Sequence, residues 1–302
     1  MIVVFGSVNV DFVTRVNAIP KPGETVLGPG YDVIPGGKGA NQALAARRAG
    51  AHVMMIGAVG KDPFANIGTA LMQEAGVDLS AMAHVDAPTG AAFITVDARG
   101  ENAITVASGA NAHAKAASLS HVSLGPKDTL LMQREVPERE QIEAAQMARA
   151  KGARVLVNVA PSGAISDDLA KLVDILIMNE HEVMDVARGM GFKCDGAENS
   201  ARMIADERGI STIVTLGAEG AVGWTGGVRR HVPAFPVTVV DTTAAGDAFC
   251  GAFAASLDAG FGFTGALGRG VAAGSLACSC YGAQPSLPRK DEIETMIGNW
   301  SA

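Results

Sequence analysis

Residues 129–159 read TLLMQREVPEREQIEAAQMARAKGARVLVNV, and this stretch contains the repeating unit of the fold. The short apolar runs Thr129–Met132 and Arg154–Val159 have the composition of buried strands. The segment Pro137–Lys151 between them has the length and pattern of a helix. A strand, a helix and a second apolar strand in this order predict two parallel strands of a sheet that is covered on both faces.

The same alternation continues through the chain in both directions. Further strands are expected at Ile2–Phe5, Val53–Ile56, Asp174–Met178, Thr212–Leu216 and Val237–Val240. Further helices are expected at Ala40–Ala49, Pro63–Ala75, Ala197–Arg208, Ala248–Ala259 and Gly265–Cys278. This pattern predicts an α/β fold, a doubly wound and mainly parallel sheet with helices on both faces. The 302 residues, 48% of them hydrophobic, are enough for one large domain, residues 1–302, with at most a small appendage.

Two stretches depart from the alternation. Residues 12–35 are rich in proline and glycine, and residues 90–107 have the pattern of a hairpin with a turn at 98–100. Neither stretch contains a helix that could form a crossover. We expect them to form together a small antiparallel sheet that stands off the main domain as a candidate lid. The alternative is an additional edge of the main sheet.

The composition narrows the class of protein. Charged residues make up 18% of the chain and the formal net charge is -7, without the basic footprint of a nucleic-acid-binding protein. No apolar run approaches the length of a membrane span, and the start of the chain lacks the features of a signal peptide. We therefore expect a cytoplasmic protein with no nucleic-acid or membrane partner. Cys278 and Cys280 are too close together for a zinc site and are expected to be buried free thiols.

The segment Asp241-Thr-Thr-Ala-Ala-Gly-Asp247 follows the expected strand Val237–Val240 and leads into an apolar helix. The free N–H groups and the positive dipole end of that helix would suit an anion such as a phosphoryl group. The small residues of the turn would let a ligand approach the backbone. Asp247 lies in the first turn of the helix, where it could act in catalysis or only stabilise the helix dipole.

Two more polar segments lie near the amino terminus. Pro35-Gly-Gly-Lys-Gly-Ala-Asn41 precedes a helix and is either a ligand-binding loop or a flexible helix start; it lacks the spacing of a P-loop. Asn9 and Asp11 follow the first strand, at the edge where open α/β sheets bind ligands. A carboxylate there could accept hydrogen bonds from two vicinal hydroxyls, and the alternative is ordinary turn chemistry.

Two strand ends later in the chain are also polar. Asn179 and Glu182 can form a capping box at a helix start, or they can organise water around Mg²⁺ and phosphate. Thr215–Gly220 is either a β-turn or one wall of a nucleotide pocket. The six histidines show no spacing of metal ligands.

Together these segments resemble the PfkB (ribokinase-like) carbohydrate kinase family over essentially the whole chain. Gly36–Asn41 resembles the first signature of that family, and Asp241–Asp247 with the following Ala-Phe resembles the second. Asn179-x-x-Glu182 matches its N-x-x-E motif. The combination is far more specific than any one motif, and it implies an ATP-dependent carbohydrate kinase.

The resemblance implies a role for each matching position. Asp247 would take a proton from the sugar hydroxyl as it attacks the γ-phosphate, and the N–H groups around Ala245 and Gly246 would stabilise the developing charge. The residues that would bind the sugar are Asn9, Asp11, Gly37, Lys38, Asn41, Glu135 and Asp247. The residues that would bind ATP are Asn179, Thr215, Gly217, Gly220, Gly246 and Val271, with Glu182 helping to position Mg²⁺.

The family resemblance also implies a potassium ion beside the phosphate site. The matching positions are Asp241, Thr243, Ala277, Cys280, Gly282 and Ser286, most of which would contribute backbone carbonyls. Cys280 stands where a basic residue is usual. Near the sugar site, Arg134-Glu135-Val differs from the usual Leu-Glu-Ser, and Val10 replaces a common alanine, so the identity of the sugar is less defined than the reaction.

The reaction that the resemblance implies is ATP-dependent conversion of D-ribose to D-ribose 5-phosphate, with the lid covering the sugar and pairing with a second subunit in a homodimer. A kinase of the same family for another sugar or a nucleoside is the alternative. A non-catalytic sugar- or nucleotide-binding protein on this fold would be marked by loss of Asp247, which is present. A nicotinamide dehydrogenase would need a G-x-G-x-x-G turn after the first strand, and Gly6-Ser-Val-Asn-Val-Asp11 lacks it.

Overall fold

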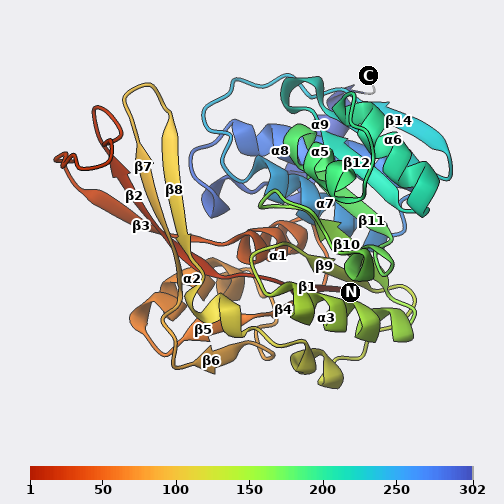
Figure 1. The fold of residues 1–302 in the computed structure, drawn as a ribbon, viewed down its shortest axis with the longest axis horizontal. Helices are drawn as coiled ribbons and strands as arrows, with labels where there is room; N and C mark the ends of the chain where they lie inside the picture. Colours follow the sequence, from red (N-terminus) through yellow and green to blue (C-terminus); the bar gives the residue numbers. More distant parts are fainter. Residues whose placement is uncertain (301–302) are drawn as a thin grey trace.

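The computed structural model describes residues 1–300, with side chains through residue 298. Within this range the main sheet has eight strands in the order β14-β13-β12-β11-β10-β9-β1-β4 (Figure 1). The strands are β1 (Ile2–Phe5), β4 (Val53–Ile56), β9 (Thr129–Met132), β10 (Arg154–Asn158), β11 (Ile175–Asn179), β12 (Ser211–Thr215), β13 (Ala221–Thr225) and β14 (Val228–Val232). Neighbours from β4 to β12 are parallel, and the pairs β12–β13 and β13–β14 are antiparallel. The expected mainly parallel sheet is confirmed.

Helices cover both faces of this sheet (Figure 1). One face packs against α1 (Lys38–Arg48), α2 (Pro63–Glu74), α7 (Ala245–Asp258), α8 (Phe263–Cys278) and α9 (Lys290–Trp300). The other packs against α3 (Glu138–Ala150), α4 (Asp167–Ala170), α5 (Glu180–Gly189) and α6 (Ala197–Arg208). The side chains of β1 alternate between the two cores, with Ile2 and Val4 in the first and Val3 and Phe5 in the second.

A second sheet stands apart from the main one (Figure 1). Its order is β3-β2-β7-β8, formed by β2 (Asn9–Arg15), β3 (Tyr31–Gly36), β7 (Gly90–Val96) and β8 (Asn102–Ala107). The hairpin β7–β8 and the pair β2–β3 are antiparallel as expected, but the central pair β2–β7 is parallel. The prediction of an antiparallel sheet is therefore wrong at its centre. No hairpin joins β2 to β7, because the chain passes through α1 and α2 between them.

Two other expectations need correction. Residues 237–240 are not a strand, because the segment follows Pro236, exposes Val239 and Val240, and bonds through the Val240 N–H to the Cys278 carbonyl at the end of α8. Cys278 and Cys280 are free thiols, but Cys278 is only half-buried and Cys280 is exposed, because α8 ends between them. The edge hairpin β13–β14, the short parallel pair β5 (Ala58–Gly60) and β6 (Ala83–Val85), and helices α4 and α9 were not predicted.

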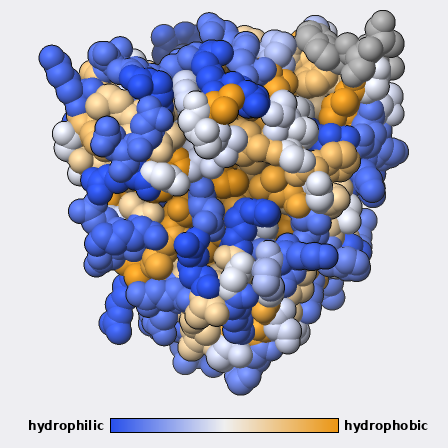
Figure 2. All heavy atoms as spheres, turned by 90° about the vertical axis from the view of Figure 1, so that its right-hand side faces the viewer, coloured by the Kyte–Doolittle hydropathy of each residue, from blue (hydrophilic) through white to orange (hydrophobic). Residues whose placement is uncertain are grey.

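The face of the molecule away from the small sheet is mostly hydrophilic, with a band of apolar atoms across its middle (Figure 2). Within residues 1–300, no helix combines the length and the apolar character needed to cross a bilayer.

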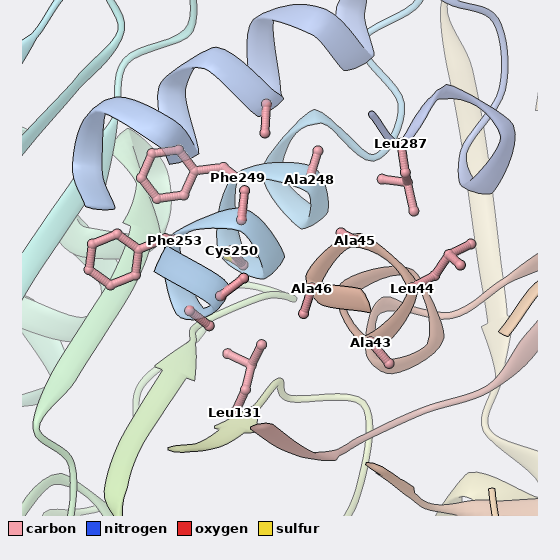
Figure 3. Packing of buried hydrophobic residues seen from close by; sticks show 14 of the residues in the cluster. Ala43, Leu44, Ala45, Ala46, Leu131, Ala248, Phe249, Cys250, Phe253 and Leu287 are labelled. Atoms are coloured by element: carbon pink, nitrogen blue, oxygen red, sulfur yellow. The ribbon is translucent and has the colours of Figure 1, made fainter. Parts of the chain in front are cut away.

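Helices α1 and α7 pack against each other, with small side chains between them (Figure 3). The reason is Gly251, where an added Cβ would lie 2.5 Å from Ala45 Cβ, 2.6 Å from Ala46 N and 2.8 Å from the Gln42 carbonyl oxygen. This close approach brings the start of α1 beside the start of α7, where Asp247 lies.

Gly251→Ala should destabilise the protein, because the methyl group has backbone atoms within clash distance and overpacking costs about 1–3 kcal/mol. The matched control is Gly268→Ala on α8, where a Cβ meets nothing within 4 Å. There the better helix propensity of alanine should stabilise by up to about 1 kcal/mol. Urea unfolding of both variants measures the difference, and equal midpoints would contradict this account of the α1–α7 contact.

Candidate active site

The carboxyl ends of the parallel strands meet at one edge of the main sheet, and the polar segments follow from them. Asn9 comes after β1, Glu135 after β9, and Asn179 and Thr215 end β11 and β12. Asn179 and Thr215 are partners in the register of these two strands. The fold thus brings side chains that are far apart in sequence to the edge where α/β proteins bind ligands.

Asp247 lies at the centre of this edge, in the first turn of α7, and is 7% exposed. Its Oδ2 accepts a hydrogen bond of 2.9 Å from Asn41 Nδ2, and its Oδ1 accepts one of 2.9 Å from Gln42 Nε2. Burial raises the pKa of Asp247, while Lys38 and the two amide donors lower it. The carboxylate is therefore held in one orientation by two donors from consecutive residues of α1.

A cavity of about 660 Å³ opens between the small sheet and the main domain, and we call it the sheet cavity. Every residue that the family resemblance assigns to the sugar lines it: Asn9, Asp11, Gly37, Lys38, Asn41, Glu135 and Asp247. The small sheet contributes apolar side chains from the other side, namely Ala92, Ile94, Ile104 and Val106. Such a mixture of polar groups at the base and an apolar cover suits a small polyhydroxylated ligand.

Asn9 and Asp11 belong to β2 rather than to a turn, so ordinary turn chemistry does not explain them. Asn9 is 2% exposed, and its Oδ1 accepts a 2.7 Å hydrogen bond from Asn111 Nδ2. Asn111 is itself fixed by the backbone of Val8, to which its Oδ1 and Nδ2 both bond. Asn9 is thus oriented before any ligand arrives.

Glu135 is held by Ser7, which follows β1, and by the start of α1. Its Oε2 accepts hydrogen bonds from Ser7 Oγ at 2.5 Å and from the Lys38 N–H at 3.1 Å. Gly37 caps this helix at a φ of 90°, and a Cβ there would lie 2.6 Å from the backbone nitrogen of Asn9. Only glycine fits both the conformation and the space, which explains the second glycine of the loop.

The carboxylates of the sheet cavity influence one another. Burial, and then the charges of Glu135 and Asp247, raise the pKa of Asp11 to about 7, with Lys38 opposing them. Burial lowers the pKa of Lys38, but the charges of Asp247 and Glu135 outweigh this effect and raise the pKa. The ammonium group therefore stays protonated. The cavity therefore contains one carboxyl group that titrates near neutral pH.

A second cavity of about 610 Å³, the helix cavity, lies between α7, α8 and residues 234–239. Its walls are mainly apolar, and most of the positions assigned to ATP line it: Thr215, Gly217, Gly220, Gly246 and Val271, together with Ala245. Gly217 and Gly220 have φ values of 54° and 88°, so the Thr215–Gly220 segment turns at its glycines. The same segment also forms one wall of the helix cavity.

A smaller cavity of about 260 Å³ lies between the other two, and we call it the bridging cavity. It shares Lys38 and Asp247 with the sheet cavity, and Thr215 and Gly246 with the helix cavity. The N-terminal end of α7 lies at this junction. The N–H groups of its first turn have no partner inside the helix, and that of Ala245 donates to the Thr242 carbonyl at 3.3 Å. Ala244, the N-cap, is left-handed with a φ of 59°, a rare conformation for a residue other than glycine.

Asn179 and Glu182 also line the bridging cavity. They form a complete capping box, in which Asn179 Oδ1 accepts from the N–H groups of His181 and Glu182, and Glu182 Oε2 accepts from the Asn179 N–H. Burial raises the pKa of Glu182, which is 6% exposed. The cap reading is confirmed, and both residues also face the space beside Asp247.

The positions matching the potassium site fall in two groups. Asp241 accepts hydrogen bonds from the N–H and Oγ1 of Thr243 and from the Gly282 N–H, so the segment before α7 and the segment after α8 lie side by side. The Ala277 carbonyl accepts from the Cys280 N–H, and Ser286 Oγ donates to the Ala283 carbonyl. Among residues 1–298, no cluster of three or more His, Cys, Asp or Glu side chains has the arrangement of a metal site.

Three residues of this site were missed by the sequence analysis: Ser7, Gln42 and Asn111. Each is buried and acts by orienting another side chain, Glu135, Asp247 and Asn9 respectively. Ser7 precedes Asn9 by two residues and Gln42 directly follows Asn41, so their position beside the two amino-terminal motifs was the available signal. No sequence signal pointed to Asn111. It lies in a short 3₁₀ helix (Gly109–His113) that only the three-dimensional structure brings next to β2.

Comparison with known proteins agrees with this geometry. A family profile described as pfkB family carbohydrate kinase matches residues 1–290. Ribokinase of Haemophilus influenzae is 38% identical over 293 residues, which cover 96% of this chain and 95% of that protein. The crystal structure of ribokinase from Thermotoga maritima matches with a TM-score of 0.91 at 34% identity, over 99% of both chains. Arabidopsis thaliana ribokinase, solved with ribose and ATP, matches with a TM-score of 0.87 at 28% identity, over 98% of both chains.

The chain belongs to the pfkB family of carbohydrate kinases. It is an ATP-dependent sugar kinase, with the ribokinase-like fold expected from the sequence.

Proposed function

We propose that this protein transfers the γ-phosphoryl group of ATP to the 5-hydroxyl of D-ribose. The observation that carries the proposal is the position of Asp247, which borders both the sheet cavity and the bridging cavity, while its neighbour Gly246 borders the bridging and helix cavities. A sugar in the first cavity and a nucleotide in the last would meet at this carboxylate. The resemblance to ribokinases favours ribose as the sugar.

In this proposal each residue has a definite task. Asn9, Asp11, Asn41 and Glu135 bind the sugar hydroxyls, and the Asp247 carboxylate accepts the proton of the attacking hydroxyl. The N–H groups of Ala245, Gly246 and Asp247 stabilise the negative charge of the phosphoryl group, and the Lys38 ammonium adds a positive charge beside it. Phosphoryl transfer depends mainly on positioning and charge, and these groups would supply both.

The other ATP contacts follow from the cavities. The apolar walls of the helix cavity, with Val271, suit the adenine ring, and the glycine turn at 217–220 lets the nucleotide approach the backbone. Glu182 and Asn179 face the bridging cavity, where they would orient the water shell of Mg²⁺ bound to the phosphates. The metal would neutralise phosphate charge during transfer.

A potassium ion would fit beside Asp241, Thr243 and Gly282, because the two segments that carry them offer oxygen ligands near the start of α7. Hydrogen bonds from Thr243 and Gly282 lower the pKa of Asp241 against the effect of burial, so its carboxylate is ionised and can hold a cation. The carbonyls of Ala277, Cys280 and Gly282, and Ser286, would complete the coordination. The ion would supply positive charge near the anion-binding N–H groups.

We further propose that residues 1–302 form one catalytic domain, with residues 12–35 and 90–107 as the lid. The apolar side chains of β7 and β8 that line the sheet cavity would exclude water from the transferred group. Phe12 of β2 stacks on Phe93 of β7 at 5.4 Å between ring centroids, and Phe93 and Tyr31 of β3 are exposed. This aromatic patch suits a second copy of the lid, so we propose a homodimer. As an ATP-dependent enzyme it would work in the cytoplasm.

A substrate panel tests the proposed function. Purified protein with ATP, Mg²⁺ and K⁺ should release ADP with D-ribose faster than with other pentoses, hexoses or nucleosides. Omission of K⁺ should slow the reaction. Faster turnover of a nucleoside or a hexose would change the assigned substrate within the family. If no sugar or nucleoside in the panel caused ADP release, the proposed function would be overturned.

The titration of Asp11 predicts a pH dependence of sugar binding. Its pKa is raised to about 7, and only the ionised carboxylate accepts hydrogen bonds from two hydroxyls. Below that pKa the group is protonated, so the KM for ribose should rise as the pH falls from 8 to 6, by about tenfold in total over this range. Asp11→Asn should bind ribose weakly and show no such rise. A wild-type KM that is constant over this range would contradict the assignment.

A further inference from the structure

A chain of buried amides lies behind Asp247, and the mechanism above does not use it. Gln42 is fully buried, and its Nε2 donates both to Asp247 Oδ1 at 2.9 Å and to Asn158 Oδ1 at 3.0 Å. Its Oε1 accepts a 2.7 Å hydrogen bond from Gln133 Nε2. Asn158 Nδ2 in turn donates to the Ile177 carbonyl at 3.1 Å. The chain thus connects α7 with the ends of β9, β10 and β11.

The chemistry of these bonds allows one orientation of the Gln42 amide. Because Asn158 uses its NH₂ group on a backbone carbonyl, its oxygen must face Gln42. A reversed Gln42 would place its oxygen against the oxygens of Asn158 and Asp247, and its NH₂ against the NH₂ of Gln133. Every such contact would be repulsive, so the neighbours fix the donor toward the carboxylate.

Close packing keeps Gln133 in place. A Cβ at Gly6 would lie 2.1 Å from Gln133 Oε1, so only glycine at the end of β1 leaves room for this side chain. Gln133 is fully buried and stands two residues before Glu135 of the sheet cavity. The chain of amides is therefore built into the sheet edge rather than added to its surface.

We propose that Gln42 is a positioning residue for the reaction: it fixes the rotation of the Asp247 carboxylate, so that one oxygen faces the attacking hydroxyl and stays unprotonated. The inference rests on the proposed role of Asp247 as the base. Asn41 also bonds to Asp247, but it lines the sheet cavity, whereas Gln42 is not among the described residues that line it. Gln42 therefore acts on the sugar only through Asp247.

This position has a kinetic signature. The Gln42 donor lowers the pKa of Asp247 against the effect of burial. Removing it should raise that pKa, and because the base works only when deprotonated, activity should be lost at a higher pH than in the wild type. A residue that merely stabilised the fold would lower activity equally at every pH.

The test is the pH profile of kcat for Gln42→Met and Gln42→Glu. The methionine variant should lose about tenfold or more in kcat, with the KM for ribose within about twofold and the acidic limb moved up by about one pH unit. The glutamate variant places a second carboxyl group against Asp247, and such a pair shares one proton. It should lose activity as the pH rises and the shared proton leaves, whereas the methionine variant should lose activity as the pH falls.

Thr212→Val is the control for lost stability. It removes a buried 3.0 Å hydrogen bond to the Ala201 carbonyl, and it should lower the unfolding midpoint without moving the pH profile. A folded Gln42→Met with the wild-type kcat and profile, or with a loss only in the KM for ribose, would overturn the inference. If Gln42→Met does not fold, a pH profile of kcat for Gln42→Glu that parallels the wild-type profile would also overturn the inference. Activity in Asp247→Asn would instead refute the base itself, which separates the two failures.

Discussion

Asp247→Asn is expected to reduce kcat by about two to four orders of magnitude. Asparagine preserves the shape of the side chain and can still accept one hydrogen bond, but it cannot take the proton of a sugar hydroxyl. Because Asp247 is buried and accepts from both Asn41 and Gln42, the amide NH₂ would also face one of these donors. A steady-state assay with saturating ribose and ATP measures the loss.

Asp78→Asn is the matched control for removing a carboxylate. Asp78 is exposed, and its Oδ1 accepts from the Ser80 N–H, a bond that asparagine can also form. Its turnover should equal that of the wild type. Near-full turnover in Asp247→Asn would mean that another group accepts the proton, and the account of the site would fail.

Gly246→Val is the second substitution with a large expected effect. Gly246 lies in the first turn of α7 at the junction of the helix and bridging cavities, and a Cβ there meets nothing within 4 Å. The side chain would therefore leave the fold intact but stand over the N–H groups that we assign to the phosphoryl group. Loss of one such donor costs about two to three orders of magnitude in other enzymes, and we expect kcat/KM for ATP to fall by at least about a hundredfold.

The control is Gly268→Val, at an equally open position on α8 away from the three cavities. Both variants should unfold at similar urea concentrations, while only Gly246→Val loses activity. Equal activity in the two would show that phosphate does not approach the start of α7.

The regular part of the fold could be predicted because its elements are defined by local pattern. The bounds of β1, β4, β9 and α6 agree with those expected, since each is a short apolar run or a helix with ordinary periodicity. Residues 237–240 have the same local pattern but lie beside α8 instead of in a sheet, and the Val240 N–H donates to the Cys278 carbonyl at the end of that helix. Pairing, unlike propensity, is decided by distant parts of the chain.

The site shows the same division. Asp247, Asn41 and Glu135 were found through motifs, and the structure brings them together in one cavity. The residues that orient them are different in kind, because an amide such as Gln42 gains its role only from the partners that surround it. The parallel pairing of β2 with β7 was likewise beyond reach, since nothing in either strand specifies the direction of the other.

The position of the transferred phosphate tests the central claim most directly. After incubation with D-ribose, ATP, Mg²⁺ and K⁺, the product can be analysed by proton-coupled ³¹P NMR. We predict a single sugar phosphate whose phosphorus couples to the two C5 protons, identifying D-ribose 5-phosphate. Phosphorylation at another carbon, or a reaction in which no pentose is phosphorylated, would contradict the assignment of these cavities and of Asp247 as the base between them.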